Sequence, residues 1–156
     1  MSVTGYDSRP ATRVHIHKVY GNLHQAICNL QTRGWKHDAS KLVEPELSGW
    51  DSLGDEHRRH AYGTEGYKAA LRAIKPTIEM HYAANDHHPE HYGIHGVGGM
   101  SLLSMLEMLC DWRAAFDRGP QTMSFAEGLV HNQARWGYSD DIADLLHNTA
   151  AELDML

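Results

Sequence analysis

The chain has 156 residues, of which 42% are hydrophobic and 22% are charged, and its formal net charge is −6. These values predict one globular domain rather than a disordered chain. The acidic balance argues against a general affinity for phosphate backbones, so no long nucleic acid is expected as a partner. No apolar run approaches the roughly 20 residues of a membrane span, and the start, MSVTGYDSRPATR, does not resemble a signal peptide. We therefore expect a cytoplasmic protein with no membrane partner.

The apolar periodicity predicts helices and no strands. In the first helix, Ile16, Tyr20, Leu23 and Ile27 repeat at spacings of three and four, and Gly34 would end it. Residues 1–11 are expected to be flexible, and residues 48–67 and 89–99 to be loops. The prediction is an all-α fold, a single compact helical domain over residues 1–156 with about six to seven helices. Their predicted positions are 12–33, 40–47, 64–75, 76–85, 100–116, and two further helices that begin near residues 124 and 139.

Local signals sharpen several of these helices. Pro76 suits a first helical turn because its missing N–H would be unpaired there. The segment 100–116 is apolar nearly all round, which predicts the central buried helix. The pattern SFAE at 124–127 predicts a capping box, and SDD at 139–141 predicts an N-cap. The inner face of the last helix is predicted to contain Leu145, Leu146, Thr149 and Leu153. The two cysteines, Cys28 and Cys110, are expected to be buried free thiols.

Histidine is unusually frequent, with thirteen residues in the chain. The segment HYAANDHHPEH, residues 81–91, places His81 on a predicted helix and His87 and His88 at its end. Neutral imidazoles bind divalent transition metals, and carboxylates complete such sites. The alternative is a solvated polar loop. Because Pro89 restrains the chain here, we favour a metal site.

Two further features involve carboxylates. In GWKHDASKLVEPE, residues 34–46, His37 and Asp38 are adjacent; Asp38 or Ser40 could cap a helix, or the pair could bind a metal. Asp111 lies inside the most apolar helix, with Glu107 four residues earlier on the same face. A buried carboxylate needs a partner, so either a nearby cation or a salt bridge, for example to Arg13, is expected. On the first helix, periodicity alone does not choose among His15, His17 and His24.

The order of these residues resembles the HD-domain superfamily of metal-dependent phosphohydrolases, and more narrowly a small HD-like family of bacterial and phage proteins. The resemblance covers HIHKVYGNL, RGWKHDASKLVEPE, YKAALRAIKPTIEMHYAANDHHPEH and MLEMLCDWRAA. Its H-x-x-[RK]-V pattern selects His15 over His17. It implies one or two divalent metal ions (Mn, Co, Fe, Ni or Mg). The implied ligands are His15, His37, Asp38 and Asp111, with His81, His87 and His88 added for a second ion.

The same resemblance implies a function. A metal-activated water would attack phosphorus in a small phosphate ester, a (deoxy)nucleotide above all. The candidate catalytic residues are Lys41, Glu107 and His88, and the candidate substrate contacts are Lys41, Lys68, Arg72, Glu90 and His91, with Arg58 and Arg59 as further phosphate contacts. Two alternatives belong to other classes: a di-iron oxygenase on the same scaffold, or a non-catalytic metal- or nucleotide-binding protein. A homo-oligomer is left open.

Overall fold

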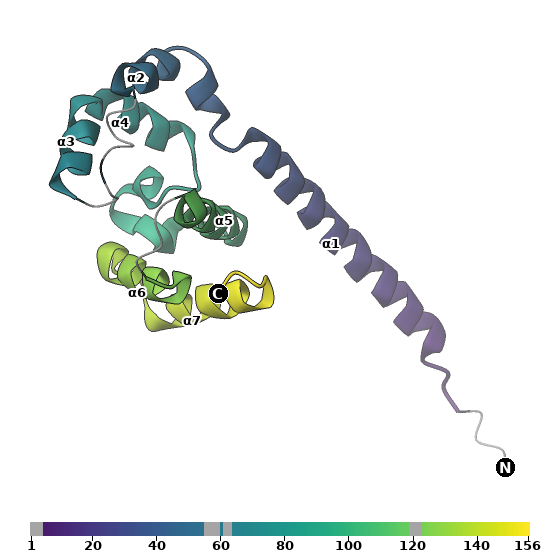
Figure 1. The fold of residues 1–156 in the computed structure, drawn as a ribbon. Helices are drawn as coiled ribbons and strands as arrows, with labels where there is room; N and C mark the ends of the chain where they lie inside the picture. Colours follow the sequence, from purple (N-terminus) through teal and green to yellow (C-terminus); the bar gives the residue numbers. More distant parts are fainter. Residues whose placement is uncertain (1–4, 55–59, 61–63, 119–122) are drawn as a thin grey trace. The chain divides into compact units, whose positions relative to one another are not determined.

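The computed structural model describes residues 5–54, 60, 64–118 and 123–156 (Figure 1). All regular structure in these ranges is helical and none of it is strand, which confirms the all-α prediction. The chain separates into two units, Met1–Lys36 and His37–Leu156, and each is described by itself.

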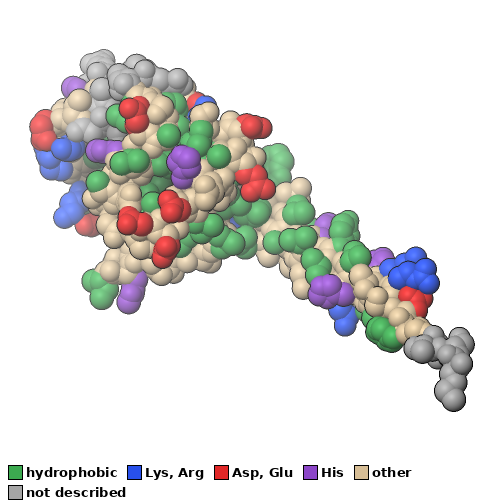
Figure 2. Space-filling view, turned by 90° about the horizontal axis from the view of Figure 1, so that it is seen from below, with side chains coloured by type: hydrophobic (Ala, Val, Ile, Leu, Met, Phe, Trp, Pro, Cys, Tyr) green, Lys and Arg blue, Asp and Glu red, His purple; other side chains and the backbone are tan. Residues whose placement is uncertain are grey.

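The first unit contains one long helix, α1 (Arg9–Lys36), of 28 residues. It begins three residues before the predicted start, so residues 9–11 are helical, and it continues past Gly34. A glycine costs a helix only about 1 kcal/mol, which a long hydrogen-bonded helix tolerates. The apolar stripe is present, and Ile16, Tyr20 and Leu23 are exposed on it. Figure 2 shows apolar and histidine side chains together on the surface of this helix.

The second unit opens with a short 3₁₀ turn, η1 (Ala39–Leu42), followed by α2 (Glu46–Leu53), α3 (Glu65–Ala73) and α4 (Lys75–Ala84). The prediction of one helix over 40–47 and a loop from 48 was wrong, because helix α2 continues through Leu53. The rest of that predicted loop lies mostly outside the described residues. The other predictions are close: Thr64 caps α3 by accepting from Tyr67 N, and Pro76 lies in the first turn of α4.

Between α4 and α5 the chain forms η3 (Pro89–Gly99), a series of 3₁₀ turns where a loop was predicted. Helix α5 (Leu102–Arg118) follows and buries Ser104, Met108 and Leu109. It is not buried all round as predicted, because Leu102 is 66% exposed and Cys110 is also exposed. Both cysteines are free, as expected, but Cys28 is only partly buried, so the prediction of two buried thiols was wrong.

The last two helices are α6 (Phe125–Trp136) and α7 (Asp140–Glu152). The predicted capping box of Ser124 with Glu127 is present, and Ser139 caps α7 by accepting from Ile142 N. The inner face of α7 is formed by Leu146 and Ala150, whereas Leu145 and Leu153 are about half exposed. The core joins η3, α5, α6 and α7 through Val97, Met100, Met108, Leu109, Phe125, Leu129, Tyr138, Leu146 and Ala150.

Over the described residues, no single helix has both the length and the apolar character of a membrane span. The bent pair Pro89–Gly99 and Leu102–Arg118 has them only jointly.

Candidate metal centre

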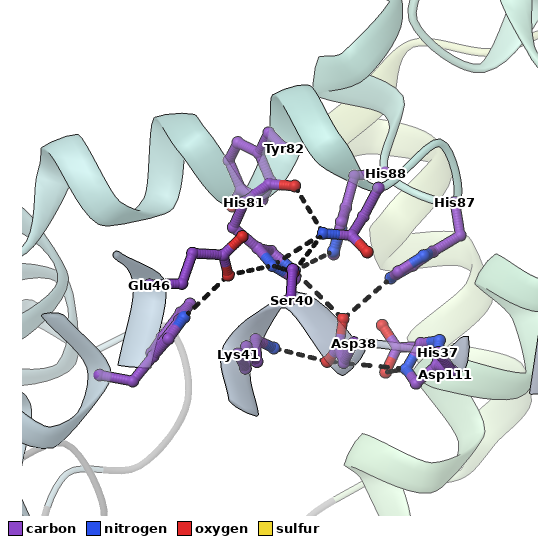
Figure 3. A network of polar contacts seen from close by, with 12 residues as sticks. His37, Asp38, Ser40, Lys41, Glu46, His81, Tyr82, His87, His88 and Asp111 are labelled. Atoms are coloured by element: carbon purple, nitrogen blue, oxygen red, sulfur yellow. Dashed lines mark hydrogen bonds and ion pairs between the residues drawn. The ribbon is translucent and has the colours of Figure 1, made fainter. Parts of the chain in front are cut away.

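Six of the seven predicted metal ligands lie together in the second unit; we call them the ligand cluster (Figure 3). They divide into two groups whose potential ligand atoms lie within 4.8 Å of one another. One group is Asp38, His81, His87 and His88, and the other is His37, His87 and Asp111. His87 belongs to both groups, so the cluster is continuous.

The backbone around Asp38 explains how two adjacent side chains reach one place. Asp38 immediately precedes η1 and has φ 55°, in the left-handed region that aspartate tolerates better than most residues. Its side chain makes no capping hydrogen bond. Ser40, the other candidate cap, lies inside η1, and its Oγ accepts a hydrogen bond from Asn85 Nδ2 at 2.9 Å. Neither residue caps η1 through its side chain, which leaves the Asp38 carboxylate available to the cluster.

The other histidines are positioned by the end of α4. His81 lies in its last turn and is 2% exposed. Asn85 follows the helix, and its Nδ2 donates to His81 O at 2.8 Å. The chain then turns, and His88 precedes Pro89 with an extended backbone. The rings of His87 and His88 are 4.1 Å apart between centroids, so the HH pair turns toward the same point as His81.

The facing atoms are ring nitrogens Nε2 and carboxylate oxygens. His81 Nε2 lies 2.9 Å from His88 Nε2 and 3.2 Å from Asp38 Oδ1. His87 Nε2 lies 3.5 Å from the same Asp38 oxygen. On the other side, His37 Nε2 lies 3.5 Å from Asp111 Oδ1 and 3.7 Å from Asp38 Oδ2. The two Asp38 oxygens therefore face different histidines.

Two glutamates lie behind the histidines. Glu46 Oε2 accepts from His81 Nδ1 at 2.9 Å. Glu107 Oε1 accepts from His37 Nδ1 at 2.9 Å and contacts His87 Nδ1 at 3.2 Å. Carboxylates in this position fix the tautomer and the ring orientation of metal-binding histidines. This placement would allow Glu107 to orient both rings, and the catalytic role predicted for it from the sequence stays a prediction.

These outer contacts decide the protonation of the inner face. A neutral imidazole that donates from Nδ1 has an Nε2 lone pair and no proton there. His81 therefore presents an acceptor to Asp38 Oδ1, which is itself an acceptor. Among the described residues, Asp38 Oδ1 and His87 Nε2 are buried without a hydrogen-bond partner. Converging buried acceptors are costly unless a cation lies between them, so the donor set suits a divalent transition metal.

The charges of the cluster agree with this chemistry. Hydrogen bonding to Asp111 raises the pKa of His37 to about 9, although burial opposes the shift. Burial alone would raise the pKa of Asp38, but the Lys41 ammonium, which is hydrogen-bonded to Asp38 Oδ2, acts in the opposite direction, and the pKa lies below its usual range. Burial lowers the pKa of His88 to about 3, aided by His87 and His81. A neutral His88 is suited to binding a metal ion, and its low pKa makes it a weak base.

Lys41 lies at the edge of the cluster. Its Nζ donates to Asp38 Oδ2 at 2.5 Å and lies 4.7 Å from the centroid of the Trp50 ring. A cation over an indole face is held electrostatically. The ammonium is thus held beside a candidate ligand, and the predicted roles of Lys41 in catalysis and substrate binding stay predictions.

The other predicted substrate contacts are less directly placed. Lys68 and Arg72 are exposed on α3 and both pair with Glu65, at 3.1 and 3.7 Å. His91 is exposed and donates from Nδ1 to Tyr82 O at 3.0 Å. Burial raises the pKa of Glu90, which lies beside Tyr82. The substrate roles of these residues stay predictions, and Arg58 and Arg59 lie outside the described residues.

The seventh predicted ligand, His15, lies on α1 in the first unit. It is about 30 Å along that helix from Lys36, at a rise of about 1.5 Å per residue. On the same helix, His17 Nδ1 contacts Arg13 O at 2.8 Å, and His24 Nε2 lies 3.6 Å from Cys28 Sγ. Because α1 is described by itself, the choice of His15 as a ligand stays a prediction.

The fold and the site together define an all-helical chain with a cluster of histidines and carboxylates that could hold a metal ion. The chain belongs to a family of unknown function, DUF5662, whose model matches residues 5–153. Comparison with curated proteins and with solved structures gave no match.

Proposed function

We propose that this protein is a metal-dependent phosphohydrolase of the HD type, acting on a small phosphate ester, and specifically on a nucleotide. The observation that carries the proposal is the convergence of Asp38 with His81, His87 and His88. His81 Nδ1 is hydrogen-bonded to the buried Glu46, and His87 Nδ1 lies 3.2 Å from Glu107. Buried acceptors that face one another are stabilised by a cation between them, so this arrangement favours cation binding. The resemblance of HD-x-S-K and HHPEH to HD-domain sequences connects the cation to phosphate chemistry.

The ligand cluster would hold one or two divalent ions. One group supplies Asp38, His81, His87 and His88, and the other supplies His37, His87 and Asp111. A metal bound there supplies Lewis acidity, which lowers the pKa of water and polarises a phosphoryl oxygen.

In this proposal, the protein's side chains orient the metal ligands and stabilise the charge that develops on the substrate. Glu107 and Glu46 keep the histidine rings in their ligand orientation. Lys41 provides a positive charge that can neutralise a phosphoryl oxygen as negative charge develops on it. Its position over Trp50 restrains the ammonium before substrate arrives, so little reorganisation is needed. The net negative charge of the chain does not oppose this function, since a small substrate needs only local cations.

The test is a hydrolysis panel on the purified full-length chain. The metal-free protein is loaded with Mn²⁺, Co²⁺ or Mg²⁺ and incubated with nucleoside mono- and triphosphates, and the released phosphate, pyrophosphate or triphosphate is identified. The proposal expects metal-dependent release that Asp38→Ala abolishes and the surface variant Asp117→Ala retains. Turnover of no member above the Asp38→Ala background would refute it. Bound metal without turnover would indicate a binding protein, and two irons with O₂ consumption would indicate an oxygenase.

A further inference from the structure

Glu46 is a buried acid that was not singled out in the sequence analysis. It lies in the first turn of α2 and is 4% exposed. A carboxylate taken out of water needs strong hydrogen-bond partners. Its Oε2 has two: His81 Nδ1 at 2.9 Å and Trp50 Nε1 at 3.2 Å. One oxygen therefore joins a candidate metal ligand to an indole.

A competing partner for His81 Nδ1 is Asn85, whose Nδ2 lies 3.0 Å away. If Asn85 donated to Nδ1, the proton of His81 would be on Nε2, which would block metal binding. The amide has only two hydrogens. They are directed to Ser40 Oγ at 2.9 Å and to His81 O at 2.8 Å. The Ser40 hydroxyl also lies near His81 Nδ1, but at 3.4 Å, whereas Glu46 Oε2 lies at 2.9 Å, so the carboxylate is the nearer partner and accepts the Nδ1 proton.

We propose that Glu46 is the positioning residue that selects the metal-binding tautomer of His81. By accepting the Nδ1 proton, it leaves the Nε2 lone pair directed toward Asp38 Oδ1 and His88 Nε2. The Trp50 indole donates to the same carboxylate oxygen and fixes its direction. Its ring also meets the His81 ring edge-on, at 5.8 Å between centroids. The inference rests on the metal centre in the proposed function and adds a determinant of its affinity.

The direct test is the location of the His81 proton. In ¹⁵N-labelled metal-free protein, long-range ¹H–¹⁵N spectra distinguish an Nδ1–H from an Nε2–H imidazole. The inference expects His81 to carry its proton on Nδ1 in the wild type, and Glu46→Ala to lose this preference. A wild-type His81 protonated on Nε2 would overturn the inference, and so would an unchanged Nδ1–H signal in Glu46→Ala. A general packing role for Glu46 would not move this signal.

Metal affinity gives the second readout, measured by competition of Co²⁺ between the protein and a chromophoric chelator. Glu46→Gln keeps an acceptor oxygen but loses the charge, so we expect it to weaken binding by about tenfold and Glu46→Ala by up to about 100-fold. Trp50→Phe removes a donor and leaves the acceptor, and its loss should be the smallest. The matched control is Glu44→Gln, whose exposed carboxylate accepts from Ser48 Oγ at 2.6 Å; it should bind as the wild type does.

The two proposals fail in different ways. If the chain hydrolyses nucleotides and both Glu46 variants keep wild-type affinity, the inference about Glu46 is refuted and the function stands. If the affinities fall in the expected order while no phosphate ester is hydrolysed, the function is refuted and the role of Glu46 stands. Since Glu46→Ala removes a buried group, circular dichroism of each variant confirms folding before affinities are compared.

Discussion

Removal of the Glu107 carboxylate should weaken metal binding more than removal of Glu46. The reason is geometric: Glu107 Oε1 contacts both His37 Nδ1, at 2.9 Å, and His87 Nδ1, at 3.2 Å, whereas Glu46 contacts one histidine. Loss of one such outer partner typically costs about 10- to 100-fold in metal affinity. Because Glu107 contacts two candidate ligands, Glu107→Ala should weaken binding by about 100-fold or more.

The assay is the same Co²⁺ competition, performed on folded, full-length protein. Asp117→Ala is the matched control, because Asp117 also lies on α5 but is half exposed and pairs with Arg113 at 3.0 Å. It should leave the affinity unchanged. Glu107→Gln keeps one acceptor oxygen without the charge and should fall between the wild type and Glu107→Ala. The reasoning is refuted if Glu107→Ala binds Co²⁺ as tightly as Asp117→Ala, or more tightly than Glu46→Ala.

Three further outcomes are expected. Asp111→Ala should lower the metal content of the purified protein, measured by plasma mass spectrometry; full content would remove Asp111 from the site. At saturating metal, Lys41→Met should lower kcat/KM about 10²- to 10³-fold, whereas Lys75→Met, which removes an exposed ion pair with Glu79 on α4, should leave kcat/KM unchanged. Because the pKa of His37 is about 9 in the metal-free chain, metal must displace its proton. Affinity should therefore rise about tenfold per pH unit from pH 7 to 8 and level off above about pH 9; a flat profile from pH 7 to 9 would contradict this.

The sequence predicted the parts of the fold that depend on local signals. The cap residues Ser124 and Ser139 and the first-turn Pro76 act through neighbours within one helical turn, so their positions can be predicted from the local sequence. The solvent exposure of individual side chains was predicted less well than the helix ends. Leu145 and Leu153 continue the helical period of α7, yet both lie at the edge of its packed face. Periodicity gives the direction of a side chain and does not show where a neighbouring element ends.

For the candidate metal centre as well, some residues could be found from the sequence and others could not. His37, Asp38, His81 and the HH pair could be collected from composition and from their order along the chain, and the structure brings them together with Asp111. Glu107 was found through its spacing of four from Asp111, but Glu46 could not be found in either way. Glu46 lies on an eight-residue helix, too short for a periodic signal, and its burial depends on contacts with residues 35 positions away. One available signal was the spacing of four between Glu46 and Trp50, which places them on one helical face.

The most direct test of the metal centre is a calorimetric titration of metal-free full-length protein with Co²⁺, in parallel with Asp38→Ala. Asp38 is the central residue because its two oxygens face histidines on both sides of the cluster. We predict saturable binding of one or two equivalents in the wild type, with loss of the high-affinity phase in Asp38→Ala. Equal stoichiometry and affinity in the two proteins would contradict the assignment of the ligand cluster as a metal centre.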